Sequence, residues 1–181
     1  NGYETHIATP KDAISYGAEA AITYLFIGYN KDEAEVKNVE NVARAVVQCH
    51  RLGLPLIIEP MARGHRIQQD KYNPEYVKLH VRMAAELGAD LIKTDYTGDP
   101  DTFRQVVRGC PVPVVIAGGP KLETEEDALR MAAEALEAGA IGVVYGRNVI
   151  QARNPQRMTE ALRMLILEKA TLEEAIKVLK G

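Results

Sequence analysis

A repeated pattern of residues that begin and end helices restricts this chain to alternating strands and helices. A capping residue followed by proline begins four expected helices, at Thr9-Pro10, Asn73-Pro74, Asp99-Pro100 and Asn154-Pro155. The side-chain oxygen of such a residue accepts a hydrogen bond from a free amide of the first turn, where proline has no N–H to lose. Two capping boxes predict further helix starts, Thr124 with Asp127 and Thr171 with Glu174.

Glycines mark the ends of the expected helices, each in the left-handed conformation that such a position favours. They are Gly17, Gly53, Gly88, Gly109 and Gly139. An apolar run follows each glycine within a few residues. The strands predicted from these runs are Ala20–Gly28, Leu54–Glu59, Ala89–Thr94, Pro113–Ala117 and Ile141–Tyr145. Because the runs are continuous rather than alternating, we expect a parallel sheet that is buried on both faces.

Repeated strand–helix units leave two main folds, an open doubly wound sheet or a (β/α)₈ barrel. The chain has five such units and a leading helix at Pro10–Tyr16, in 181 residues. A closed barrel needs eight units and about 250 residues. The chain is therefore either an open sheet or, as the motifs below favour, the carboxyl-terminal portion of a barrel in a single domain.

Composition places the chain among ordinary globular proteins, with 46% hydrophobic and 26% charged residues. Lys and Arg number 22 against 25 Asp and Glu, and this balance argues against nucleic acid as a partner. The apolar stretches are too short to span a bilayer. Cys49 and Cys110 are expected to be reduced core residues of a cytoplasmic protein. No residue cluster has metal-ligand spacing, so we expect no metal and no cofactor.

Lys93 interrupts a buried strand at its carboxyl end. Burial disfavours the ammonium form, so the pKa of Lys93 should be lowered. A neutral amine is what Schiff-base chemistry with a carbonyl substrate requires. The structural alternative is a lysine that reaches solvent or pairs with Asp95 or Asp99.

Two consecutive strand-end loops have the composition of a phosphate site. Gly118 and Gly119 follow one strand, and Gly146 with Arg147 follows the next. Glycines let backbone amides come close to an anion. A short helix after Gly146 would point its amino end at that anion, and the arginine adds a charged hydrogen-bond donor. In (β/α)₈ enzymes the loops after the last two strands usually bind phosphate. A simple turn remains the alternative for either loop alone.

The segments Gly88–Asp99, Gly109–Lys121 and Gly146–Asn148 together resemble the archaeal-type class I fructose-bisphosphate aldolase family. That family also contains aminodideoxyheptulosonate synthases and autoinducer-2 thiolases. The resemblance implies a (β/α)₈ barrel whose sixth strand carries the Schiff-base lysine, here Lys93. It also implies phosphate binding by Gly118, Gly119, Gly146 and Arg147, and a homo-oligomer, often a decamer.

The chain departs from the family pattern on the strand before Lys93. The family's aldolases have a Tyr-Pro-Arg-Gly segment there, whose tyrosine handles protons, and Met61 stands at that position here. Arg63 is retained as a substrate-binding residue. Glu59 is the expected substitute, since burial can raise the pKa of a carboxyl toward neutrality. A salt bridge with Arg63, Arg66 or Lys93 is the alternative for Glu59, and His65 is a further candidate.

The family's first strand ends in an Asp-His-Gly segment, which this sequence lacks. The pattern places Asn1 just after the third strand, so we expect the sequence to be a fragment that lacks three strands. Five strands alone would expose a long hydrophobic edge.

These observations predict a Schiff-base aldolase that cleaves or forms a phosphorylated ketose. Lys93 forms an iminium ion, Glu59 removes a hydroxyl proton, and the two loops hold the phosphate. The alternatives are a synthase or transaldolase of the same family, a thiolase of the autoinducer-2 type, and a non-catalytic phosphosugar-binding subunit.

Overall fold

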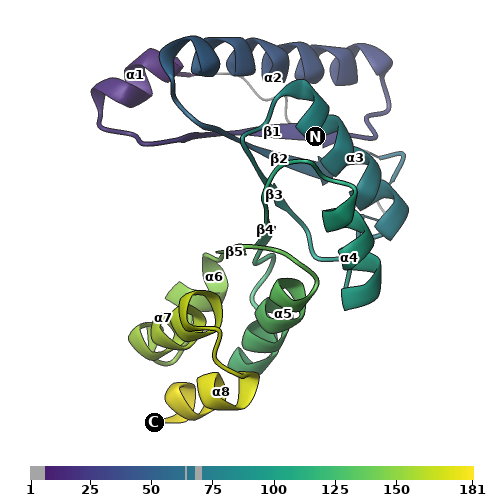
Figure 1. The fold of residues 1–181 in the computed structure, drawn as a ribbon. Helices are drawn as coiled ribbons and strands as arrows, with labels where there is room; N and C mark the ends of the chain where they lie inside the picture. Colours follow the sequence, from purple (N-terminus) through teal and green to yellow (C-terminus); the bar gives the residue numbers. More distant parts are fainter. Residues whose placement is uncertain (1–6, 64, 68–70) are drawn as a thin grey trace.

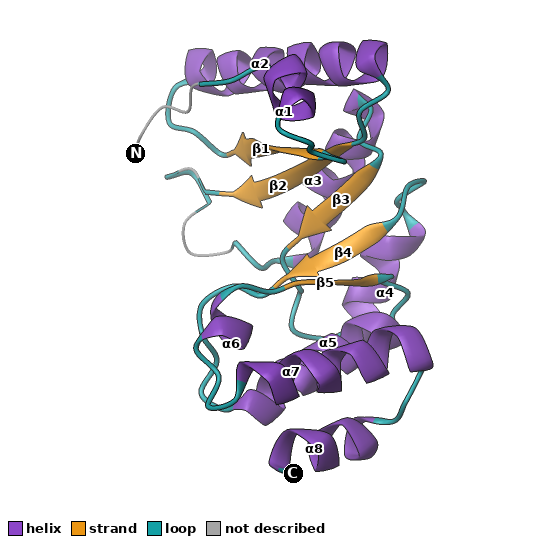
Figure 2. Cartoon of the chain, turned by 90° about the vertical axis from the view of Figure 1, so that its left-hand side faces the viewer, coloured by secondary structure: helices purple, strands orange, loops and turns teal. Residues whose placement is uncertain are grey.

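The computed structural model describes residues 7–63, 65–67 and 71–181. Its sheet has five strands: β1 Ala21–Ile27, β2 Leu56–Ala62, β3 Leu91–Thr94, β4 Val114–Ala117 and β5 Gly142–Val144. They lie side by side in chain order, and all four neighbouring pairs are parallel. Because the strands are parallel, their carboxyl ends lie along one side of the sheet, as the arrows of β1 to β4 in Figure 2 show.

The helices begin where the caps predict. They are α1 Pro10–Ser15, α2 Asp32–Leu52, α3 Pro74–Leu87, α4 Pro100–Arg108, α5 Glu125–Glu137, α6 Arg147–Ile150, α7 Pro155–Arg163 and α8 Leu172–Lys180, with a π-helical turn at Met164–Glu168. All six predicted capping residues accept a hydrogen bond from the first turn of their helix. Gly109 is a correction: its φ of −80° is right-handed. The Cys110 amide bonds to the Val107 carbonyl and so continues the turn, whereas after Gly88 the Ala89 amide reaches back to the Ala84 carbonyl, which requires a left-handed glycine.

Strand order and helix placement decide between the two candidate folds. A doubly wound sheet reverses its strand order and carries helices on both faces. Here the order is sequential, and α3 lies behind the strands, with α2 beyond β1 and α7 and α8 beyond β5 (Figures 1 and 2). The arrangement is that of consecutive units of a (β/α)₈ barrel.

The core lies between the sheet and its helices. Leu25, Ile58, Ile92 and Ile116 are fully buried on the helix side of four successive strands. A second cluster joins α5, α7 and α8 around Leu129. The prediction that both faces are buried is wrong for the outer strands: Ile22 on β1 is 46% exposed and Val144 on β5 is 42% exposed. Both belong to the face opposite the helices, which would line the interior of a barrel.

Side chains of α2 form hydrogen bonds with backbone groups along the outer edge of β1. Asn38 accepts from the Phe26 amide at 2.8 Å and donates to the Tyr24 carbonyl at 3.2 Å. Glu35 accepts from the amides of Gly28 and Tyr29. The expected exposed edge is therefore capped over this stretch, since α2 supplies partners that a neighbouring strand would otherwise provide.

Candidate active site

Lys93 and Glu59 form a largely buried ion pair on the face opposite the helices. The Nζ atom of Lys93 lies 2.7 Å from Oε2 of Glu59. Their side chains are 17% and 8% exposed. The alternative partners suggested by sequence, Asp95 and Asp99, do not form this contact: Asp99 instead caps α4. The pair brings a primary amine and a proton acceptor together on adjacent strands.

Pro60 explains why the pairing of β2 with β3 ends beside this pair. The backbone groups of Leu56 face β3, since its carbonyl accepts from the Asp90 amide. The backbone of Pro60, four residues after Leu56 on the same strand, also faces β3. Proline, however, has no N–H to donate to that strand. The pairing of β2 with β3 accordingly ends at Ile58 with Ile92. Paired with β1 alone, β2 continues to Ala62, beyond the predicted end at Glu59.

A second pair of opposite charges lies at the neighbouring strand ends. Arg63 follows β2 and its Nη2 atom lies 3.6 Å from Oδ2 of Asp95, which follows β3 and is 4% exposed. Burial raises the pKa of Asp95 above its usual range; Arg63 opposes this shift and Glu59 adds to it. The mouth of the site thus holds two cations and two carboxylates. From the sequence alone, Asp95 is indicated only as a possible partner of Lys93.

The two glycine loops predicted to bind phosphate are tied to each other. Arg147 donates through Nη2 to the Gly119 carbonyl at 2.9 Å. Asn148, which is buried, donates to the Gly118 carbonyl at 2.7 Å and accepts from the Leu122 amide at 2.9 Å. The sequence pattern by itself gives no sign of this role of Asn148. These bonds join the loops after β4 and β5 into one unit.

The glycines predicted to bind phosphate differ in whether their backbone amides are free to bind a ligand. The amide of Gly118 is already bonded to the Val144 carbonyl at 3.3 Å, and a side chain at Gly118 would meet the Tyr145 ring. Gly119 has a left-handed φ of +60° and open space where a side chain would be. Gly146 likewise faces open space. Gly119 and Gly146 are therefore the positions at which a ligand can approach the backbone.

Among the described residues, none of the remaining sequence candidates forms a hydrogen bond or ion pair with Lys93. Met61, two residues beyond Glu59, is buried. His65 is exposed, and Arg66 pairs with Asp32. Gly64 of the retained Arg-Gly pair lies outside the described residues. Cys49 and Cys110 are free cysteines, Cys49 being buried. Within the described part of the chain, no three His, Cys, Asp or Glu side chains form a group able to hold a metal ion.

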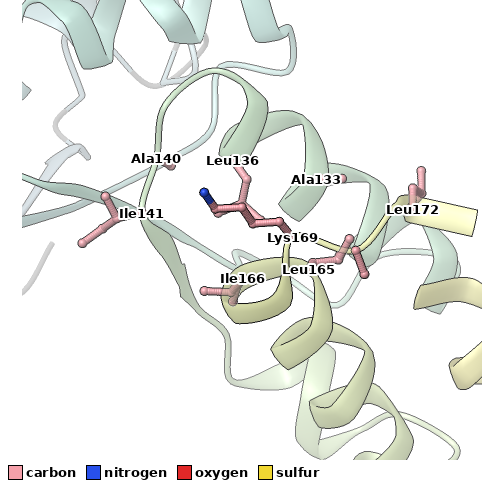
Figure 3. A pocket seen from close by; sticks show the side chains of 9 residues that line it. Ala133, Leu136, Ala140, Ile141, Leu165, Ile166, Lys169 and Leu172 are labelled. Carbon is pink, nitrogen blue, oxygen red and sulfur yellow. The ribbon is translucent and has the colours of Figure 1, made fainter. Parts of the chain in front are cut away.

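Two cavities lie at opposite ends of the strands. The loops after β3 and β4 enclose about 270 Å³, lined among others by Asp95, Gly118 and Gly119. Another cavity, about 370 Å³, is lined by apolar residues of α5 and the π-helical turn, with Lys169 reaching across it (Figure 3). It lies by Ile141, just before β5 begins, and so belongs to the amino-terminal end of the sheet.

None of the helices in the described ranges is both long enough and apolar enough to cross a bilayer.

Comparison with known proteins identifies relatives over nearly the whole chain. The family described as DeoC/LacD family aldolase matches residues 3–152. An uncharacterized aldolase of Saccharolobus solfataricus is 42% identical over 179 residues, which cover 99% of this chain and 66% of the relative. The class 1 fructose-bisphosphate aldolase of Thermoproteus tenax is 38% identical over 181 residues, covering 98% of this chain and 67% of the relative.

Solved structures agree with these sequence matches. The crystal structure of an archaeal fructose 1,6-bisphosphate aldolase superposes with a TM-score of 0.85 at 38% identity. The superposition covers 92% of this chain and 66% of the other. The chain thus spans about two thirds of the length of the proteins it matches.

Proposed function

Because this chain belongs to the DeoC/LacD family of aldolases, we propose that it carries the catalytic centre of a Schiff-base aldolase acting on a phosphorylated ketose, such as fructose 1,6-bisphosphate. The observation that supports this most directly is the contact of 2.7 Å between Lys93 and Glu59 at the open end of the β2–β3 ladder. An amine with a carboxylate at this distance has a base to receive its proton before it attacks a carbonyl.

In the proposed reaction the neutral amine of Lys93 adds to the ketone. Glu59 returns the proton it received to the hydroxyl group of this adduct, water leaves, and an iminium ion forms with Glu59 again ionised. Glu59 then removes the proton of the hydroxyl group on the carbon that will become the aldehyde. The carbon–carbon bond breaks, its electron pair moves to the iminium nitrogen, and an enamine remains. Protonation of the enamine carbon and hydrolysis release the second product and restore Lys93.

The phosphate group is proposed to bind where the two loops meet, on the amides of Gly119 and Gly146 and the guanidinium of Arg147. Gly118 contributes by bringing the loops close together, since its own amide is occupied. Arg63 is proposed as a further substrate contact from the end of β2. Binding at a fixed distance from Lys93 sets which carbon lies over the amine.

A synthase or transaldolase is the second candidate, and Met61 is the observation that favours it. A thioether cannot transfer a proton in the way that a tyrosine does. A site without that tyrosine is suited to a different acceptor or a different proton path. A panel of phosphorylated ketoses and aldehyde acceptors, assayed for both cleavage and synthesis, separates this candidate from an aldolase.

Borohydride trapping tests the proposal. Dihydroxyacetone phosphate and fructose 1,6-bisphosphate would each be incubated with the natural full-length chain and reduced with sodium borohydride. Peptide mass spectrometry should then locate a stable adduct on Lys93. Lys93→Met and Lys93→Arg should both abolish it, because neither side chain offers a neutral primary amine. Absence of any adduct in the wild-type protein would favour a non-catalytic phosphosugar-binding role, and an adduct that survives both substitutions would exclude Lys93.

A further inference from the structure

Three titratable side chains occupy one level of three adjacent strands. Tyr24 on β1 is the register partner of Glu59 on β2. Glu59 in turn contacts Lys93 on β3. Neighbouring strands lie about 4.8 Å apart, so the phenol, the carboxylate and the amine form a row across the sheet. The reaction proposed above uses two of its three members.

The packing of β1 shows that Tyr24 projects from the same face as Glu59. Leu25 is fully buried, and side chains of a strand alternate between its faces. The rings of Tyr24 and Phe26 are parallel within 1° with centroids 5.7 Å apart. Two rings stacked in this way extend from the sheet side by side, so the Tyr24 ring stands on the face that also carries Glu59.

The backbone at this point is held in place by α2. Asn38 is buried, and its side chain bonds to the Tyr24 carbonyl and the Phe26 amide, on either side of Leu25. Tyr24 itself is 38% exposed. The residue therefore combines a fixed backbone, a ring fixed by stacking and a side of the residue that is open to solvent. Such positioning is what proton transfer to a bound substrate requires.

We propose that Tyr24 is a second catalytic residue, which donates the proton that converts the enamine back to an iminium ion. This inference rests on the proposed aldolase function. Glu59 holds the proton that it took from the substrate hydroxyl. As the Tyr24 hydroxyl gives its proton to the enamine carbon, Glu59 passes its own proton to the phenolate oxygen. The hydroxyl proton of the substrate thus reaches the carbon through Glu59 and Tyr24, and no other reactant is needed.

Tyr24→Phe is the decisive variant, because it removes the hydroxyl group and keeps the ring that stacks on Phe26. The probe is dihydroxyacetone phosphate in deuterated water, with the full-length chain. An enzyme that forms the enamine reversibly exchanges a carbon-bound proton of this compound for deuterium, which is followed by nuclear magnetic resonance. We expect Tyr24→Phe to slow this exchange by about 100-fold or more, while borohydride trapping on Lys93 stays at the wild-type level.

Tyr76→Phe is the matched control. Tyr76 lies on α3 and is also 38% exposed. Its variant should exchange and trap like the wild type. The double variant of Glu59→Gln with Tyr24→Phe should be no slower than the slower single variant, because both residues belong to one relay.

Each result has a separate meaning. If Tyr24→Phe exchanges deuterium at a rate within a few-fold of the wild-type rate, the proposal is overturned. It is also overturned if the two substitutions slow exchange independently, so that their effects multiply in the double variant. A wild-type protein that forms no adduct with dihydroxyacetone phosphate or fructose 1,6-bisphosphate would overturn the aldolase function itself. Normal trapping with lost exchange supports the assigned role of Tyr24.

Discussion

Lys93 and Glu59 meet at 2.7 Å just where the backbone pairing of their two strands stops. The contact places a cation and a carboxylate side by side with little access to water. Opposite charges in such a setting stabilise each other, and either charge left without its partner would lower the stability of the fold. The same pair therefore matters for stability as well as for the proposed chemistry.

Lys93→Met should destabilise the protein by about 3–5 kcal/mol at neutral pH, because it leaves the Glu59 carboxylate buried without a partner. Urea unfolding of the wild type and the variant measures this difference. The matched control is Arg82→Met, which breaks a pair of similar length, 2.6 Å to Glu86, between side chains that are 58% and 61% exposed. Exposed pairs contribute under about 1 kcal/mol. Equal effects of the two substitutions would contradict the importance of burial.

Glu59→Gln should lower kcat by about 100- to 10,000-fold, the usual contribution of general acid–base catalysis. Glutamine keeps the size of the side chain but cannot accept a proton at neutral pH. Borohydride trapping on Lys93 should persist but proceed more slowly, because water can receive the amine proton in place of Glu59. Steady-state kinetics and trapping are compared with those of Glu86→Gln, a substitution on the solvent-exposed face of α3. Near-normal turnover by Glu59→Gln would assign Glu59 a structural role only.

Arg147→Ala should raise KM for phosphorylated substrates by about 10- to 100-fold, since a charged hydrogen bond is worth about 1.5–3 kcal/mol. Unphosphorylated analogues should be affected far less. Arg108→Ala is a control of the same charge, because Arg108 is exposed at the end of α4, before β4 begins. If both classes of substrate respond equally to Arg147→Ala, the phosphate group binds elsewhere.

His80 should make the protein sensitive to acid. This residue lies on α3, is 1% exposed, and burial lowers its pKa from 6.5 to about 4. Between these two values the unfolded chain holds a proton that the folded protein excludes. Stability is therefore complete above pH 6.5 and falls as pH decreases toward 4, by about 3 kcal/mol in all. Urea unfolding at several pH values should show this loss in the wild type.

His80→Phe should be less sensitive to pH over that range, because phenylalanine does not titrate. The comparison is between slopes, so the other ionisable groups contribute equally to both proteins. Identical slopes for wild type and variant would show that His80 is not the group responsible.

Local signals in the sequence predicted most of the fold because the interactions involved are local. Thr124 and Asp127 are three residues apart, and their capping box forms as expected. Gly109 was predicted wrongly because its conformation depends on how α4 ends, which an isolated glycine does not specify. For the candidate site, the placement of Lys93 at a strand end followed from one apolar run.

The contacts within the site could not be predicted in the same way. Glu59 and Lys93 are 34 residues apart, and three partners were equally plausible for Glu59 until the strand register was known. Asn148 bonds to Gly118, 30 residues away. The effect of Pro60 depends on which neighbour its missing N–H would have faced. Each of these features arises from strand pairing, which a single sequence does not reveal.

The capping of β1 by Asn38 and Glu35 also bears on how this molecule behaves toward others. A bare strand edge can recruit a strand from another molecule and so begin aggregation. Here the amides of Phe26, Gly28 and Tyr29 already have acceptors within the same chain. A foreign strand would have to displace a buried asparagine and a carboxylate before it could form its first bonds, so this stretch of β1 is protected from acting as a template.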